Sequence, residues 1–109
     1  MTHKQIADMV KSVGLPCAYY EFPDGTDQAP PFICFYYPEA DDVYADNKNY
    51  AGINRLYVEL YTDEKDFSKE AAVEAVLTNS GLSFSKSELY INSERMWQIT
   101  YRMEVIING

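Results

Sequence analysis

The sequence predicts a single small α+β domain with a mostly antiparallel sheet and its helices packed on one side. The 109-residue chain contains ten tyrosines, and aromatic side chains favour β-structure. Two segments carry apolar residues at helical spacing, while five others have the alternation or the apolar content of strands. Their order is helix, three strands, helix, two strands, which is typical of this fold class.

The first helix is expected over residues 2–13. Thr2 followed by Gln5 is a capping-box pattern, and apolar residues then recur on one helical face. Gly14 and Pro16 end the helix, because glycine tolerates the left-handed cap conformation and proline cannot continue the hydrogen-bond ladder.

Strands are expected over residues 17–22, 32–37 and 56–61. Residues 32–37 are almost entirely apolar or aromatic, so both faces of that strand should be covered, by its own chain or by a neighbouring subunit. Between the second and third strands lies a long acidic loop, residues 39–54. Long loops without regular structure are uncommon in compact domains unless they have a function. A solvated loop and a subunit or partner contact both remain open for it.

The second half of the chain predicts a helix and a hairpin. Asp66 is the expected N-cap of the helix, which ends at Asn79 to Gly81. Its expected apolar stripe consists of Phe67, Ala71, Ala72, Val73, Val76 and Leu77. A fourth strand follows over residues 82–91, and the last segment alternates strictly between apolar and polar residues. Its apolar set is Trp97, Ile99, Tyr101, Met103, Val105 and Ile107, so its register should be firmly set.

The charge of the chain excludes several functions. Nine basic against 17 acidic residues leave a net charge of −8, which disfavours nucleic-acid binding and anionic membranes alike. The sequence has neither an apolar run of membrane-spanning length nor the apolar core of a signal peptide, so a cytoplasmic location is expected. Cys17 and Cys34 fall on two predicted strands and could face each other, but reduced thiols are the expected state.

Known catalytic patterns are largely missing from the sequence. His3 is the only histidine and the five glycines stand singly, so no histidine metal site, catalytic triad or phosphate-binding loop is expected. Asp24 with Asp63 and Lys65 superficially imitates a metal-dependent nuclease, although these residues fall in predicted turns. The acidic loop lacks the regular alternation and the glycine of a calcium loop. We therefore expect no catalytic residue, cofactor or metal, and no enzymatic activity.

The tyrosines indicate an assembling protein. Without basic residues between them they make a poor nucleic-acid stacking platform. They are too numerous for one small core to cover, and tyrosine is enriched at protein interfaces. Those on or next to the first three predicted strands are Tyr19, Tyr20, Tyr36, Tyr37, Tyr57 and Tyr61.

Several motifs carry a family resemblance. They are residues 31–37, the Tyr44-Ala45-Asp46-Asn47 segment of the acidic loop, residues 57–66, and residues 88–91 with 94–98. In this order, over residues 30–107, they resemble the small tail-completion proteins of long-tailed bacteriophages of Gram-positive hosts. Within that group the chain is similar to the lambda-type tail terminator.

The resemblance implies a virion structural protein of the tail, assembled in the host cytoplasm. Such a subunit forms a homo-oligomeric ring, expected to be a hexamer, at the head-proximal end of the tail tube. The ring stops polymerisation of the tube protein, offers a surface to the head-completion or connector protein, and lets DNA pass without specific binding. Another head–tail joining or tail-completion subunit of the same fold is the alternative, and a metal-dependent nuclease is the alternative from another class. The expected interface residues are Asp41, Asp42, Tyr44, Asp46, Asn47, Tyr57, Tyr61 and Arg102.

Overall fold

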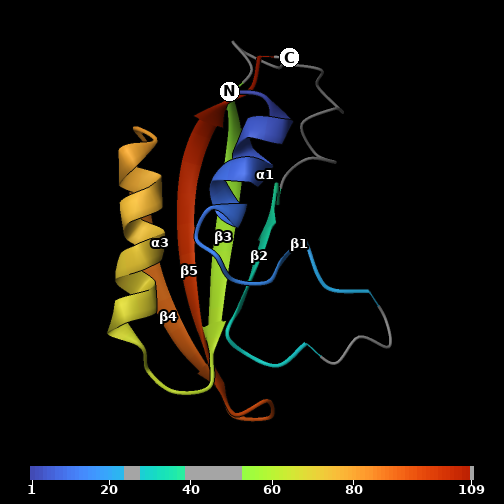
Figure 1. Cartoon of the computed structure of the whole chain (residues 1–109), viewed down its shortest axis with the longest axis vertical. Coiled ribbons are helices and arrows are strands. Elements are labelled where there is room, and N and C mark those ends of the chain that lie inside the picture. Colours follow the sequence, from blue (N-terminus) through green and yellow to red (C-terminus); the bar gives the residue numbers. More distant parts are fainter. Residues whose placement is uncertain (24–27, 39–52, 109) are drawn as a thin grey trace.

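The computed structural model describes residues 1–23, 28–38 and 53–108, which form an α+β domain (Figure 1). The element order confirms the predicted succession of one helix, three strands, one helix and two strands. In chain order the elements are α1 (His3–Lys11), β1 (Cys17–Tyr19), β2 (Phe32–Tyr36), β3 (Ile53–Thr62), α3 (Phe67–Asn79), β4 (Phe84–Ile91) and β5 (Met96–Ile106). Among the described residues, no helix is both long and apolar enough to cross a bilayer.

The five strands form one sheet in the order β1-β2-β3-β5-β4. β1 runs parallel to β2, and the other three neighbouring pairs are antiparallel, as expected for a mostly antiparallel sheet. β3 and β5 form the centre, paired continuously from Ile53 opposite Ile106 to Thr62 opposite Trp97. Within the described part of the chain, β1 and β4 are therefore the two edges of the sheet.

Local sequence signals set the ends of both helices. The Thr2 side chain accepts a hydrogen bond from the Gln5 backbone at 3.0 Å, and the Gln5 side chain accepts one from the Thr2 backbone at 2.8 Å. This reciprocal pair is the predicted capping box. Asp66 caps α3 as expected, because its carboxylate accepts from the Lys69 backbone N–H at 3.0 Å. Gly14 has a φ of +94°, a conformation that glycine adopts without strain.

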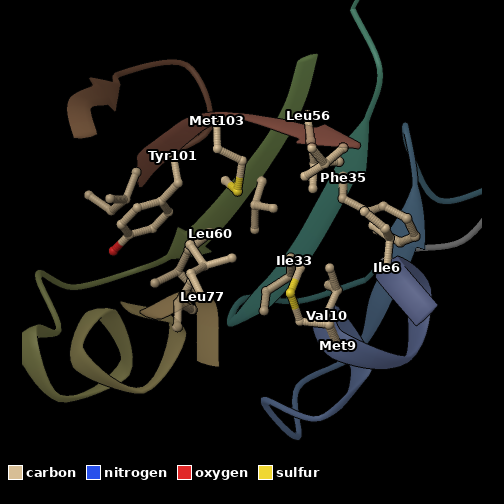
Figure 2. Packing of buried hydrophobic residues seen from close by; sticks show 14 residues of the cluster. Ile6, Met9, Val10, Ile33, Phe35, Leu56, Leu60, Leu77, Tyr101 and Met103 are labelled. Carbon is tan, nitrogen blue, oxygen red and sulfur yellow. The ribbon is translucent and has the colours of Figure 1, made fainter. Parts of the chain in front are cut away.

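The hydrophobic core lies between the sheet and both helices, which cover the same face (Figure 2). α1 contributes Ile6, Met9 and Val10, and α3 contributes Val73 and Leu77. The strands contribute Ile33, Phe35, Leu56, Val58, Leu60, Ile99, Tyr101, Met103 and Val105. The predicted dry face of the last strand is thereby confirmed, with Trp97 and Ile107 only partly buried at its ends.

Several boundaries differ from the prediction, and β4 begins at Phe84 rather than at residue 82. α1 is shorter than residues 2–13 and ends at Lys11. β1 ends at Tyr19 rather than at residue 22, because Tyr20 adopts a φ of 69°, which breaks the extended backbone. β3 begins at Ile53, inside the segment predicted as a loop, because pairing with β5 extends the strand. The rest of that acidic loop lies outside the described residues.

The predicted apolar stripe of α3 is partly wrong. Phe67, Ala71 and Ala72 are exposed, while Glu70 is only 2% exposed. The reason lies in β4, whose inner side carries the charged pair Lys86 and Glu88 between Phe84 and Tyr90. α3 therefore turns a carboxylate, rather than its alanines, toward this part of the sheet.

The cysteines are not cross-strand partners. Cys17 pairs with Ile33, and Cys34 pairs with Ala18, so the two thiols belong to opposite faces of the sheet. Both thiols are free. Cys34 and its neighbours Ile33 and Phe35 are all buried, which confirms that both faces of β2 are covered.

Candidate interaction surface

The side of the sheet opposite the helices, here named the open face, carries most of the functional candidates. Strand alternation places every second residue there, because the intervening ones enter the core. The open face consists of Phe32, Cys34 and Tyr36 of β2, Tyr57, Glu59 and Tyr61 of β3, Gln98, Thr100 and Arg102 of β5, and Ser85, Ser87 and Leu89 of β4.

Glu59 stands at the centre of the open face and is only 8% exposed. Tyr36 donates a hydrogen bond to Glu59 Oε2 at 3.0 Å, and Tyr61 donates one to Glu59 Oε1 at 2.8 Å. Gln98 in turn donates from Nε2 to the Tyr61 hydroxyl at 3.0 Å. Both carboxylate oxygens are thus satisfied, which a buried carboxylate requires.

The two tyrosines are held as hydrogen-bond donors. Burial, reinforced by the charge of Glu59, raises the pKa of Tyr36 to about 12. Burial and the hydrogen bond to Glu59 also raise the pKa of Tyr61 above its usual value. Both phenols therefore stay protonated throughout the physiological pH range and can donate to Glu59.

Aromatic rings surround this network. Phe32 stacks on Tyr61 with ring centres 4.8 Å apart, and Phe22 meets Phe32 edge to face at 5.4 Å. Tyr36 contacts Tyr57 at 5.6 Å and Tyr20 at 5.5 Å between ring centres. Such pairs add to the stability gained from burial alone. The result is a layer of rings that shields Glu59 in place of a covering helix.

Arg102 supplies a positive charge on another part of the open face. Its guanidinium lies 5.1 Å from the centre of the Tyr57 ring and donates to the Ser87 hydroxyl at 2.8 Å. An open hollow of about 250 Å³ adjoins this pair and is lined by Arg55, Tyr57, Ser85, Arg102, Met103 and Glu104.

Exposed apolar side chains gather at the two edges of the sheet. Tyr19 and Tyr20 lie at the β1 edge, 51% and 61% exposed. Phe67 of α3, with Leu89 and Tyr90 of β4, lies at the opposite edge, and Phe67 is 73% exposed. A separate exposed pair, Ile53 and Ile106, lies side by side where the central strands β3 and β5 begin and end. Exposed apolar groups at strand edges favour contact with other chains.

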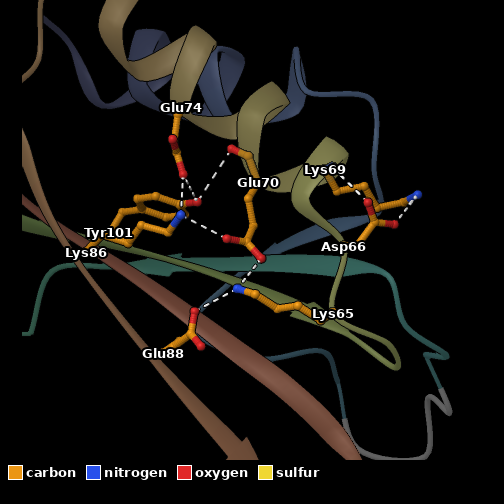
Figure 3. Close-up of polar contacts among 8 residues, drawn as sticks. All are labelled: Lys65, Asp66, Lys69, Glu70, Glu74, Lys86, Glu88 and Tyr101. Atoms are coloured by element: carbon orange, nitrogen blue, oxygen red, sulfur yellow. Dashed lines mark hydrogen bonds and ion pairs between the residues drawn. The ribbon is translucent and has the colours of Figure 1, made fainter.

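A layer of ion pairs attaches α3 to the β4 edge (Figure 3). The Lys65 ammonium lies 2.6 Å from both Glu70 Oε2 and Glu88 Oε1. The Lys86 ammonium lies 2.8 Å from Glu70 Oε1 and 2.7 Å from Glu74 Oε2. Tyr101 donates a hydrogen bond to the same Glu74 oxygen at 2.9 Å. These ion pairs hold the beginning of α3, which carries Phe67, against β4 at that edge of the subunit.

Glu70 is charged despite its burial. Burial acts to raise its pKa, but hydrogen bonds from Lys65 and Lys86 outweigh it and hold the pKa below the usual value of 4.5. Because both oxygens face an ammonium group, Glu70 serves as the centre of the ion-pair layer.

The structure brings together three of the predicted interface residues. Tyr57 and Tyr61 flank Glu59 on β3, and Arg102 packs over Tyr57. The remaining five, Asp41, Asp42, Tyr44, Asp46 and Asn47, lie outside the described residues. The sequence reasoning missed Glu59, although a single carboxylate on the wet side of an alternating strand, between two tyrosines, is a signal that could have found it.

The nuclease-like residues are placed as follows. Lys65 points between Glu70 and Glu88, and Asp63 accepts a hydrogen bond from the Glu64 backbone at 3.0 Å. Asp24 lies outside the described residues. In the part of the chain that the structure describes, no three histidine, cysteine or acidic side chains gather closely enough to hold a metal ion. His3 contacts Tyr37, with Nδ1 and Oη 2.9 Å apart.

Comparison with known protein families, with curated proteins and with solved structures finds no match to this chain.

Proposed function

We propose that this chain is a phage or prophage tail terminator, a structural subunit that forms a ring at the head-proximal end of the tail tube. The observation that carries the proposal is the pair of apolar edges: Tyr19 and Tyr20 at one end of the strand order, and Phe67, Leu89 and Tyr90 at the other. The motif resemblance supplies the identity of the assembly.

Two different edges on one subunit favour a head-to-tail contact. When the β1 edge of one copy meets the β4 edge of the next, every copy uses both edges, and the chain of contacts closes into a ring if the rotation permits. Burying one fully exposed aromatic or aliphatic side chain is worth about 1.5–3 kcal/mol. The five side chains on the two edges are 38–73% exposed, so burying them supplies a part of this energy from each residue at every seam.

The charge of the chain suits a ring around a DNA channel. Each copy carries a net charge of −8, and a negative lumen repels phosphates, so DNA passes without adhering. The tube protein and the head-completion protein would contact the two rims of this ring.

Electron microscopy of tails assembled without this protein tests the proposal. If the ring ends polymerisation, its absence yields tail tubes that exceed the normal length and fail to join heads. Re-supplying the wild-type chain should restore a uniform length. Tails of normal length without the protein would refute termination.

The same images separate the terminator from its alternative. Another head–tail joining subunit of the same fold shares the edge argument, because the fold does not decide between these roles. Tails of normal length that lack heads would identify that joining role.

A further inference from the structure

A second hollow lies on the open face, close to the hairpin between β4 and β5. It has a volume of about 410 Å³ and is here named the acidic groove. Its apolar walls include Phe22, Phe32, the Tyr61 ring and Met96, and its acidic members are Glu21 and Glu94. The groove thus combines aromatic rings, a thioether and carboxylates in one depression.

The charged side chains that line the acidic groove are of one sign. Glu21 and Glu94 are both exposed, and Tyr61 connects the groove to the buried carboxylate of Glu59 through its 2.8 Å hydrogen bond. Among the described residues that line the groove there is neither lysine nor arginine. A depression lined by one sign of charge and apolar walls concentrates its electrostatic field on a ligand of the opposite sign.

We infer that the acidic groove binds an arginine or lysine side chain presented by a partner protein. The face of an aromatic ring attracts a cation, and a guanidinium also stacks on such a ring while it hydrogen-bonds to a carboxylate. The aliphatic stem of the same side chain would lie along Phe22 and Met96, since long basic side chains cover apolar surface while their charge stays hydrated.

The chemistry of the walls selects this occupant. A purely apolar segment would leave Glu21 and Glu94 beside an uncharged surface, and a phosphate would be repelled by them. A basic side chain can stack on the aromatic rings and pair with the carboxylates at the same time. The inference goes beyond the ring proposal and does not depend on it, because the groove lies within one subunit. Of its described lining residues, only Tyr20 also belongs to the proposed seam.

Nuclear magnetic resonance of the ¹⁵N-labelled full chain tests the inference with two acetylated, amidated tripeptides. The probe is Gly-Arg-Gly, and its matched control is Gly-citrulline-Gly, which has nearly the same shape but no charge. We expect the arginine peptide to shift the backbone signals of residues 20–22, 32–34 and 94–96 in a saturable manner. The citrulline peptide should bind about tenfold more weakly, because it lacks the cation.

Charge-removing variants locate the binding. Glu94→Gln and Glu21→Gln should each weaken binding of the arginine peptide roughly two- to fivefold, the effect of an exposed ion pair. Glu104→Gln removes the same charge from the far end of β5, roughly 26 Å from Met96 along the strand. This control variant should bind the arginine peptide as the wild type does.

Four outcomes would overturn the inference. Equal binding of the two tripeptides would show that no cation is recognised. Signal shifts confined to other residues, or equal losses in Glu94→Gln and Glu104→Gln, would show non-specific attraction to an acidic protein. Shifts at the groove that follow protein concentration, and that the arginine peptide does not displace, would identify a second copy of the chain as the occupant.

Discussion

Replacing Glu70 with glutamine should destabilise the domain, because Glu70 is the centre of the ion-pair layer between α3 and β4. The substitution keeps the size of the side chain but removes the charge that faces Lys65 and Lys86 at 2.6 and 2.8 Å. A hydrogen bond to a charged group contributes about 1.5–3 kcal/mol to stability. The hydrogen bond from Lys65, together with the ion pair to Lys86, sets the upper bound of the expected loss at roughly twice this value.

Two features of the layer reduce this bound. Lys65 keeps Glu88 and Lys86 keeps Glu74 as partners, so neither ammonium is left alone. The two lysine side chains are also 22% and 35% exposed, so water screens their charges. We therefore expect a loss of about 2 kcal/mol in the free energy of unfolding, equivalent to a fall of roughly 8 °C in Tm.

Urea unfolding measures this loss. Trp97 is the only tryptophan and is partly buried against the core, so its fluorescence reports unfolding. Glu88→Gln is the matched control, since this carboxylate is 46% exposed and contacts only Lys65 in the layer. We expect the control to lose less than about 1 kcal/mol. Equal losses in the two variants, or an unchanged stability of Glu70→Gln, would refute the reasoning.

The pH dependence gives an independent check on Glu70. Its pKa is lowered in the fold, so the ionised carboxylate adds stability that is fully present above pH 4.5, the usual value. That stability is lost as the pH falls through the lowered pKa. The difference in the free energy of unfolding between wild type and Glu70→Gln should therefore be constant near neutral pH and shrink progressively below pH 4.5. A gap that stays constant on acidification would contradict the ionised state.

Three further predictions concern the edges, the open face and the core. Leu89→Asp and Tyr20→Asp should each prevent ring closure. An equal mixture of the two variants should nevertheless form heterodimers in native mass spectrometry, because each variant keeps one intact edge. Absence of the heterodimer would contradict a head-to-tail seam. Tyr61→Phe leaves one oxygen of the central carboxylate without its donor, and should cost about 1–3 kcal/mol in urea unfolding. Ile99→Ala, at a fully buried position, should cost about 2–5 kcal/mol, and a loss near zero would show that the core repacks.

Much of the fold could be predicted from local patterns. Helix caps and turns depend on residues only a few positions apart, so the sequence alone predicts them. Examples are the capping pair Thr2 and Gln5, the N-cap Asp66 and the glycine at position 14. The strict alternation of the last strand likewise predicted the dry face occupied by Ile99 and Tyr101, because a strand with one buried face has a period of two. Signals of this kind need no knowledge of what packs against them.

Contacts between distant segments were decided only by the tertiary structure. Helical periodicity assigned the exposed Ala71 to the core and overlooked Glu70, because burial of a carboxylate depends on Lys65 and Lys86 lying on either side of it. Strand alternation likewise marked Glu59 as polar, yet Tyr36 from another strand makes it a shielded centre. By itself the sequence determined the elements, their order and the charge of the chain. Which polar groups are buried, and which apolar ones remain exposed at the edges, was decided by the packing of residues far apart in sequence.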